Sequence, residues 1–422
     1  MSPPRHTQGG TTVPGPGYRF FGDEERANVM AVLDRWYANR EAFDDPGEGE
    51  WVRRFERAAA ERFGAAHCLG VNSGTSALVA ALVGLGIGPG DEVIVPGYMF
   101  VASIAAVLHC GADVVLAEVD ESLTLDPADV RARITPRTRA IMPVHMLGAP
   151  ADMTALRDLA DKHGLQLLED CAQSAGGSYR GRPLGTLGSA GAFSLNHYKV
   201  ITSLQGGFVL SDAPLVFQRA YSFHDQGWFP YRQDRGEGDL LLGMNLGLGE
   251  LHAAVALAQL NKLDLILGRI RDVKRRLVEA IGELPGVRGR TLHDPAGECG
   301  TVAVYVFEDA GHAQEVADRL GTRTLLDSPT HYYAGLPALT AFGRGDRSTV
   351  PFRAPGGRPT HPFEPGALPR TDSVLARSLA LATGVSDGYL GPGTGVHADS
   401  SNAEIDHAAD TFRRAVKGEA LP

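Results

Sequence analysis

Cysteine is scarce in this sequence, with four among 422 residues, and the four lie far apart without a CxxC pair. This spacing argues against a disulfide framework and against a cysteine zinc cluster, and it is typical of proteins from a reducing cytoplasm. No apolar stretch approaches the roughly 18–20 residues that cross a bilayer, and the start of the chain has no apolar signal segment. We therefore expect a cytoplasmic protein with no membrane partner.

Long basic runs are also missing. Forty Lys and Arg residues against fifty Asp and Glu residues give a formal net charge of −10. Because nucleic-acid affinity depends on basic contacts to phosphates, we expect no nucleic-acid partner. The sequence has neither an HExxH motif nor a clustered His/Asp spacing, so it predicts no metal site.

Glycine, by contrast, is abundant. The chain has 52 glycines, about 12% of its residues against a usual figure of about 7%. Its 43% apolar and 21% charged residues are typical of a globular protein, and its length leaves room for two or three domains. The glycine surplus marks either linkers or places of tight backbone geometry.

Short β-rich runs alternate with helical segments along the first half of the chain. This alternation predicts an α/β fold with right-handed crossovers and a mostly parallel sheet covered on both faces, whose ligands bind at the carboxyl ends of the strands. Strands are expected at Cys68–Val71, Glu92–Val95, Asp113–Glu118, Ala140–Val144, Leu165–Glu169, Ala190–Leu195 and Gly207–Leu210. Helices are expected at Gly22–Tyr37, Trp51–Phe63, Ser76–Gly84, Val101–His109, Pro127–Ile134, Met153–His163, Gly249–Leu263 and Gly268–Glu283.

Composition and pattern divide the chain into three parts. We expect a disordered tail over residues 1–17, a large domain over 18–265 and a smaller α+β domain over 266–422. Within the smaller domain, Val302–Phe307 is expected to be a strand and His312–Arg319 a helix. Gly343–Pro369, rich in Gly, Pro and Arg, is expected to be a long functional loop.

Two short motifs stand at predicted strand ends. In Leu69–Leu78 a strand ends in a Ser/Gly/Thr turn that opens a helix, which favours an anion such as phosphate; a merely capped turn is the alternative. In Leu165–Gln173 a buried-strand pattern ends in Glu169 and Asp170. Asp170 would be partly desolvated at the ligand edge unless it only caps the next segment, and Glu169 points the opposite way.

A third motif, Ala192–Lys199, places a lysine among apolar and small residues between two predicted strands. Desolvation lowers the proton affinity of a lysine, which suits covalent chemistry with an aldehyde, whereas an exposed turn lysine is the alternative. A phosphate-type helix start, a strand-end Asp and such a Lys are together what pyridoxal 5'-phosphate needs. The combination therefore indicates an enzyme that uses this cofactor.

At this point the sequence resembles the DegT/DnrJ-type sugar aminotransferases, pyridoxal-phosphate enzymes of fold type I, from about Phe20 to Val416. The motifs that carry the resemblance are Asn72–Leu78, Gly88–Pro96, Pro143–Gly148 with Ala151–Met153, Glu169–Gln173 and Phe193–Lys199.

The resemblance implies roles for individual residues. Lys199 matches the catalytic lysine that binds the cofactor aldehyde and then moves the substrate proton, and Asp170 matches the catalytic partner of the pyridine nitrogen. Asn245 matches an asparagine that reaches the phosphate of the neighbouring subunit's cofactor, which implies a homodimer with shared active sites. Further positions that match cofactor-binding residues are Gly74, Thr75 and Ser194 at the phosphate, Phe100 over the ring and Gln173 near the ring hydroxyl.

The sequence departs from the family on the substrate side. Ser203–Gly207 has neutral Gln205 in place of the family's glutamate, and Asn245–Leu248 lacks a tyrosine and an arginine, the latter at Gly247. His145 lies at a predicted strand end, and we expect it to contact cofactor or substrate; Gln205 and His331 are expected substrate residues as well. A plain surface histidine is the alternative at His331.

These observations predict an aminotransferase that moves an amino group from glutamine or glutamate to a keto-sugar or keto-cyclitol. A lysine at position 199, where the family's dehydratases have histidine, favours transamination over dehydration. Two alternatives stay open: a pyridoxal-phosphate enzyme of another type (elimination, decarboxylation or carbon–carbon bond formation), and a non-catalytic regulatory member.

Overall fold

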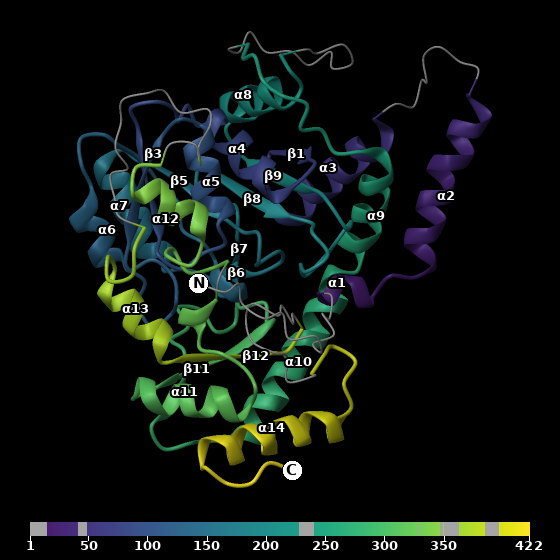
Figure 1. Cartoon of the computed structure of the whole chain (residues 1–422). Helices are drawn as coiled ribbons and strands as arrows, with labels where there is room; N and C mark the ends of the chain where they lie inside the picture. Colours follow the sequence, from purple (N-terminus) through teal and green to yellow (C-terminus); the bar gives the residue numbers. More distant parts are fainter. Residues whose placement is uncertain are drawn as a thin grey trace.

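The computed structural model describes residues 15–40, 49–227, 240–328, 330–346, 349, 363–384 and 396–422. Two sheets organise the chain, a large one in the upper part of Figure 1 and a small one beneath it. Within the described part of the chain, no helix is both long and apolar enough to span a membrane.

The large sheet has seven strands in the order β1-β9-β8-β5-β4-β2-β3. Its neighbours are parallel from β3 to β8, whereas β9 runs antiparallel to both β8 and β1. The predicted α/β fold with a mostly parallel sheet is therefore confirmed. The strands are β1 (His67–Val71), β2 (Glu92–Pro96), β3 (Asp113–Ala117), β4 (Thr138–Ile141), β5 (Gln166–Asp170), β8 (Ala190–Ser194) and β9 (Gly207–Ser211).

Helices cover both faces of this sheet, so alternate residues of one strand enter different cores. Val93 and Val95 of β2 pack in the core beneath α4, α5 and α8, while Ile94 packs in the core beneath α3, α6, α7 and α9. This two-sided burial explains the unbroken apolar runs of the strands. The helices are α3 (Glu50–Phe63), α4 (Gly74–Gly84), α5 (Ala102–His109), α6 (Pro127–Arg133), α7 (Met153–His163), α8 (Pro214–His224) and α9 (Glu250–Asn261).

A smaller antiparallel sheet, β10-β11-β12, builds the second part of the molecule. α10, α11 and α14 pack on it, and α10 also reaches the large core, because Ile266 and Ile270 lie there while Leu277 lies in the small core. The predicted boundary at residues 265 and 266 thus falls inside α10 and stays a prediction. The elements are α10 (Leu263–Ile281), β10 (Val287–Gly289), β11 (Val302–Phe307), α11 (Ala310–Arg319), β12 (Ser378–Ala382) and α14 (Asn402–Val416).

Shorter elements complete the fold. They are α1 (Pro16–Arg19), α2 (Asp23–Ala38), the hairpin of β6 (Ser178–Tyr179) and β7 (Arg182–Pro183), α12 (Pro337–Gly343) and α13 (Pro369–Ala376), with 3-10 turns at Met146–Gly148 and Leu325–Asp327. In Figure 1, α2 runs along α9 at the side of the large sheet.

Two sequence-based expectations need correction. Residues 1–14 of the predicted tail lie outside the described residues, but Gly15, Pro16 and Gly17 are buried and Gly15 donates a backbone hydrogen bond to His197. Of the predicted loop, residues 347, 348 and 350–362 lie outside the described residues; its first residue ends α12 and its last begins α13. Among the elements that the sequence did not predict are α8, β12 and α14.

Candidate active site

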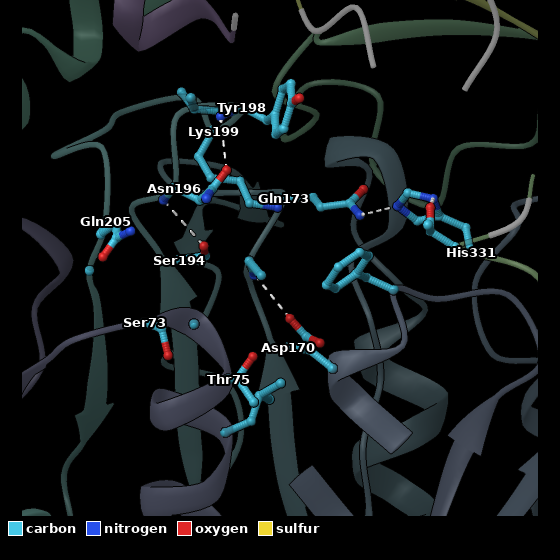
Figure 2. A pocket seen from close by; sticks show the side chains of 18 of the residues that line it. Ser73, Thr75, Asp170, Gln173, Ser194, Asn196, Tyr198, Lys199, Gln205 and His331 are labelled. Atoms are coloured by element: carbon cyan, nitrogen blue, oxygen red, sulfur yellow. Dashed lines mark hydrogen bonds between the residues drawn. The ribbon is translucent and has the colours of Figure 1, made fainter. Parts of the chain in front are cut away.

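A cavity of about 630 Å³ lies at the carboxyl ends of the parallel strands, where this fold class binds ligands. Figure 2 shows the start of α4, Asp170, Lys199 and the pair Gln173–His331 arranged around it. The structure brings nine of the predicted site residues to its lining: Gly74, Thr75, Phe100, Asp170, Gln173, Ser194, Lys199, Gln205 and His331. His145 and Asn245 are placed elsewhere.

The start of α4 forms one wall of the cavity. Ser73 caps the helix, since its Oγ accepts a hydrogen bond from the Ser76 N–H at 3.0 Å. A Cβ at Gly74 would lie 2.7 Å from the Ser194 Cβ, so only glycine lets the helix start pass this close to β8. The first N–H groups of a helix lack partners within the helix, and its dipole is positive there, so this wall suits a phosphate.

Asp170 ends β5 at the floor of the cavity and is 3% exposed. Its Oδ2 accepts a hydrogen bond from the Ser103 Oγ at 2.7 Å, and its Oδ1 accepts one from the Ala172 N–H at 3.0 Å. Burial raises the pKa of Asp170, and the hydrogen bonds and the Lys199 ammonium offset only part of that rise. A cationic N–H group facing this carboxylate would restore the charged form.

Lys199 lies in the loop between β8 and β9 and is half-buried. A turn fixes its backbone, because the Lys199 N–H donates to the Asn196 carbonyl at 3.0 Å. Beyond the turn, the Ser203 N–H donates back to the Leu195 carbonyl at 3.0 Å, so the loop closes on the end of its own strand. The lysine therefore reaches the cavity from a short, backbone-bonded loop.

Gln173 and His331 form a hydrogen-bonded pair on the opposite wall. The Gln173 Oε1 accepts from the Leu147 N–H at 2.9 Å, which turns its amide nitrogen toward the His331 Nε2 at 3.4 Å. The His331 Nε2 is then an acceptor, and its Nδ1–H faces the Thr330 hydroxyl at 3.0 Å. Burial, aided by the Lys199 ammonium, lowers the pKa of His331 to about 3, so the ring is neutral at ordinary pH.

This pKa predicts an acid sensitivity of the apoprotein. A histidine with a folded pKa near 3 stabilises the fold above its unfolded value of about 6.5, and that contribution is lost as pH falls from 6.5 toward 3. Urea unfolding at pH 7.5 and pH 5 should therefore show roughly 2 kcal/mol less acid destabilisation in His331→Gln than in the wild-type protein. The exposed His163→Gln should show the wild-type difference. Equal acid destabilisation in His331→Gln would contradict the assignment.

Phe100 is held against His331 by backbone pairing between two distant segments. The Met99 N–H donates to the His331 carbonyl at 2.9 Å, and the Tyr333 N–H donates to the Gly97 carbonyl at 3.1 Å. The Phe100 and His331 ring centroids are 5.6 Å apart. A loop of the second part of the chain thus forms one wall of the cavity together with the large sheet.

Gln205 lines the cavity mouth and is exposed. The Ser203 Oγ donates to the Gln205 carbonyl at 2.6 Å, and the preceding Leu204 has a left-handed φ of 70°. These contacts fix the backbone of the turn and leave the side-chain amide of Gln205 at the opening.

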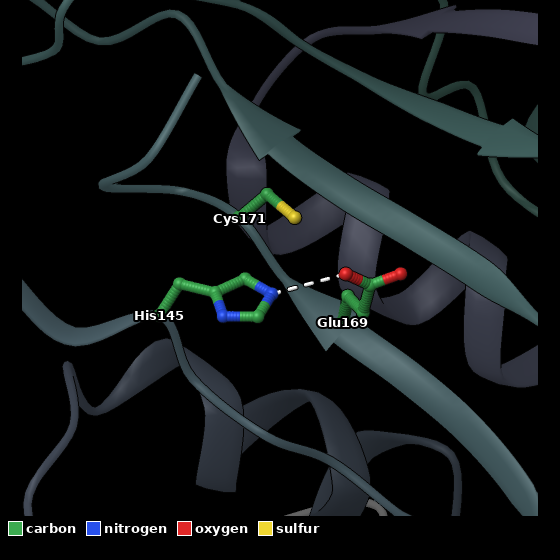
Figure 3. Close-up of side chains that lie close together, drawn as sticks. All are labelled: His145, Glu169 and Cys171. Carbon is green, nitrogen blue, oxygen red and sulfur yellow. Dashed lines mark hydrogen bonds and ion pairs between the residues drawn. The ribbon is translucent and has the colours of Figure 1, made fainter. Parts of the chain in front are cut away.

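His145 is not on the cavity wall, which corrects the expectation that it contacts cofactor or substrate. It is fully buried on the other side of β5, where its Nδ1 accepts from the Ala151 N–H at 3.1 Å and its Nε2–H faces the Glu169 carboxylate at 3.1 Å (Figure 3). Glu169 points away from the cavity, as predicted, and also accepts hydrogen bonds from the N–H groups of Gly185, Leu187 and Gly188.

Cys171 lies beside this pair, and the ligand atoms of His145, Glu169 and Cys171 fall within 4.8 Å of one another. Burial, with a smaller effect of the Glu169 carboxylate, raises the pKa of the Cys171 thiol well above its usual range, so the sulfur keeps its proton. His145 and Glu169 bond to each other and to backbone N–H groups, and the neutral Cys171 thiol lies beside them. His145 and Glu169 therefore form a buried pair whose polar atoms have hydrogen-bond partners within the protein.

Asn245 is exposed and lies outside the cavity lining, with its Oδ1 accepting from the Gly247 N–H at 3.3 Å. Its segment is tied to the site, because the Asn72 N–H donates to the Leu246 carbonyl at 2.7 Å. Its role toward a neighbouring subunit stays a prediction.

Several residues in or next to the cavity lining were not foreseen from the sequence. Ser103, which bonds Asp170, left one signal: a single hydroxyl within an apolar helix start, three residues after Phe100. Thr301 and Thr330 have no sequence signal, because only the folding of the whole chain brings the second part of the molecule to the cavity. Asn72, Asn196 and Tyr198 flank residues that the sequence analysis named.

The residues that line the cavity fit pyridoxal phosphate. The helix start beside Gly74 and Ser194 can hold the phosphate, Asp170 can face the ring nitrogen and Lys199 can meet the aldehyde. A buried carboxylate with a raised pKa at the floor of the cavity is a feature that a protonated ring nitrogen would explain.

Comparison with known proteins agrees with this geometry. Residues 35–348 match the DegT/DnrJ/EryC1/StrS aminotransferase family. An L-glutamine:2-deoxy-scyllo-inosose aminotransferase of Micromonospora echinospora is 37% identical over 328 residues, which are 73% of this chain and 76% of that protein. A GDP-perosamine synthase of Vibrio cholerae is 37% identical over 265 residues, 63% of this chain and 69% of that protein.

Among solved structures, that of 3-amino-5-hydroxybenzoic acid synthase superposes on this chain with a TM-score of 0.74 and 27% sequence identity. The superposition covers 94% of this chain and 97% of the synthase chain. The fold, the motifs and the curated relatives therefore agree. The chain belongs to the DegT/DnrJ/EryC1/StrS family of aminotransferases.

Proposed function

We propose that this chain is a pyridoxal-phosphate-dependent aminotransferase that moves an amino group from glutamine or glutamate to the ketone of a cyclitol. One observation carries the cofactor: Lys199, Asp170 and the start of α4 line a single cavity at the strand ends. Family membership supports the same conclusion. A regulatory member would leave this three-part arrangement without a use, whereas an elimination would use all three parts, so family membership is what favours transamination.

The residues divide the work between binding and proton movement. When bound, the cofactor supplies an aldehyde that carries the amino group and a ring that accepts electron density. The first N–H groups of α4 and the Ser194 hydroxyl hold the phosphate, and Asp170 holds a proton at the ring nitrogen. The Lys199 amine can take the proton from the donor carbon in the first half-reaction and deliver a proton to the acceptor carbon in the second. Gln173 and His331 can orient the edge of the cofactor ring that faces them.

The charge of the cavity supports an uncharged acceptor. Among the described residues that line it, Lys199 is the only lysine or arginine. A nucleoside diphosphate needs cationic partners for its phosphates, whereas a cyclitol needs hydrogen bonds such as Gln205, Thr301 and Thr330 can make. A Cβ at Gly247, where the family tends to have arginine, would meet only the Asn245 Oδ1 at 3.8 Å, so sterics do not forbid a side chain there.

The test supplies the purified holoenzyme with glutamine carrying ¹⁵N at its α-amino group and with either scyllo-inosose or a nucleoside-diphosphate keto-sugar. We expect ¹⁵N in the amino product of the cyclitol, detected by mass spectrometry, and no labelled product with Lys199→Ala. Label only in the nucleotide-linked product would overturn the acceptor class. Consumption of acceptor without label would favour another pyridoxal-phosphate reaction.

We also propose that the active form is a homodimer with shared sites. The segment that carries Asn245 exposes large apolar side chains, with Leu240 73%, Leu242 94% and Met244 52% exposed. Such a patch beside the cavity fits a surface that a second copy covers, which would bring Asn245 to the partner's phosphate. Light scattering should give the dimer mass, and Leu242→Asp should shift it toward the monomer; a monomeric active wild type would overturn the proposal.

A further inference from the structure

The first described residues of the chain lie against the backbone of the loop that carries Lys199. The Gly15 N–H donates to the His197 carbonyl at 2.9 Å, and the Gly17 N–H donates to the Lys199 carbonyl at 3.4 Å. Gly15 and Gly17 are buried in this contact, as is Pro16 between them. A segment far away in the sequence thus bonds to the peptide group of the proposed catalytic lysine itself.

Glycine at these positions is required by space rather than by conformation. Gly15 has φ −62° and ψ 172°, which any residue can adopt, yet a Cβ there would lie 2.3 Å from the Tyr198 carbonyl carbon and oxygen. A Cβ at Gly17 would lie 2.8 Å from the Ile201 Cα and 2.9 Å from the Val200 carbonyl oxygen. Because these neighbours are backbone atoms, they cannot rotate away. A side chain would force the two segments apart.

A second contact holds the far end of the same loop. Gln259 of α9 is fully buried, and its Oε1 accepts a hydrogen bond from the Thr202 N–H at 3.3 Å. Its amide nitrogen donates to the Glu25 Oε1 at 2.8 Å, and the Lys262 Nζ lies 2.6 Å from the Glu25 Oε2. Burial alone would raise the pKa of Glu25, but the hydrogen bonds from Lys262 and Gln259 lower it on balance, so this carboxylate is ionised.

The ion pair therefore fixes the amide of Gln259 in one orientation. With Nε2 committed to Glu25, the Oε1 must face Thr202. Glu25 also accepts from the Gly22 N–H at 2.8 Å, which joins the start of α2 to the same network. Figure 1 shows α2 lying along α9, which is the arrangement that this network needs.

We propose that Gly15, Gly17 and Gln259 form a clasp that fixes the loop over residues 197–202 and thereby sets the direction from which the Lys199 amine enters the cavity. They are positioning residues, since none of them lines the cavity. A catalytic group must be held within about 0.5 Å of its productive place, and these contacts add to the loop's own turn and to the burial of Val200 and Ile201 in the large core. The inference rests on the role proposed for Lys199.

The first test is hydrogen exchange of the apoprotein, measured by mass spectrometry on peptides that cover residues 196–203. In Gly15→Ala and Gly17→Ala we expect the amides of this loop to exchange at least tenfold faster than in the wild type, while peptides from β2 and β3 keep their rates. Gly268→Ala is the matched control, because this exposed glycine of α10 lies outside the network and its Cβ would meet nothing within 4 Å. Wild-type exchange in the loop of both variants would overturn the clasp.

The second test reports the lysine itself. Apoprotein is treated with acetic anhydride, and acetylation of Lys199 is compared with that of the exposed Lys162 and Lys417 in the same sample. We expect Lys199 to react several-fold faster in the glycine variants and in Gln259→Leu, which removes the contact without adding bulk at the loop. A loosened loop with wild-type Lys199 reactivity would overturn the positioning role.

These measurements need no turnover, so they separate this inference from the proposed function. A wild-type enzyme that transfers no amino group would refute the function and leave both tests intact. If Gly15→Ala fails to fold, Gln259→Leu with Gln259→Glu gives the same comparison. We expect fast exchange of the loop amides in both variants of position 259, because leucine makes no hydrogen bond there and glutamate cannot donate one to Glu25.

Discussion

Replacement of Lys199 by alanine should lower glutamine-dependent amination by roughly 10⁴-fold or more, because a single amine both meets the cofactor aldehyde and moves the substrate proton. The cavity offers no substitute: among its described lining residues no other lysine is present, and His331 is on the opposite wall with a depressed pKa. The measurements are turnover with labelled glutamine and the visible absorption band that covalently bound cofactor gives.

Three controls give this result its meaning. Lys162→Ala, on the exposed end of α7, should keep full turnover and the band. Lys199→Arg keeps the positive charge but not the nucleophilic amine, so it should lose the band as alanine does. Thermal unfolding of the Lys199→Ala apoprotein should match that of the wild type to within a few degrees. A Lys199→Ala enzyme that still turns over would refute the role assigned to this residue.

The parts of the site that could be predicted from the sequence share one physical origin. Each is a short motif at the carboxyl end of a strand, and parallel topology brings such ends to one edge. Asp170, Lys199 and the start of α4 therefore lie together although the sequence separates them by many residues. Their neighbours in the same motifs, such as Asn72 and Asn196, follow for the same reason.

What could not be predicted depends on packing between distant segments. His145 also ends a strand run, yet the chain turns it behind β5 to meet Glu169, and no pattern in the sequence specifies that side. The run at residues 207–210 was recognised as a strand, but its antiparallel direction follows from the short return after Lys199. The hydrogen bond from Gly15 to His197 has no local signature, since a run rich in proline and glycine predicts a disordered tail.

The second large effect concerns Asp170, whose burial has opposite consequences for activity and for stability. Asp170→Asn cannot carry the negative charge that keeps a ring nitrogen protonated, so amination should fall by roughly 10²–10³-fold. Asparagine is preferable to alanine here, because it fills the same volume, its amide oxygen can still accept from the Ala172 N–H, and its amide nitrogen can donate to the Ser103 hydroxyl. Asp158→Asn, at an exposed position of α7, is the control and should leave amination unchanged.

The apoprotein should respond in the other direction. A carboxyl whose folded pKa is raised gives a stabilising contribution that is fully present below its unfolded pKa of about 3.9 and is lost as pH rises through the folded value. At neutral pH the wild-type apoprotein therefore bears the cost of a buried charge that Asp170→Asn lacks. Urea unfolding at pH 7.5 should show the variant to be more stable by about 1 kcal/mol, with the difference shrinking toward pH 4.

Bound pyridoxal phosphate should reverse this difference in stability between the wild type and Asp170→Asn. A protonated ring nitrogen placed against the carboxylate would relieve the cost of burial, so saturating pyridoxal phosphate should stabilise the wild type more than Asp170→Asn. An apo variant less stable than the wild type at pH 7.5 would mean that the bonds from Ser103 and Ala172 already compensate the buried charge. Equal stabilisation of both proteins by the cofactor would mean that Asp170 does not face the ring nitrogen.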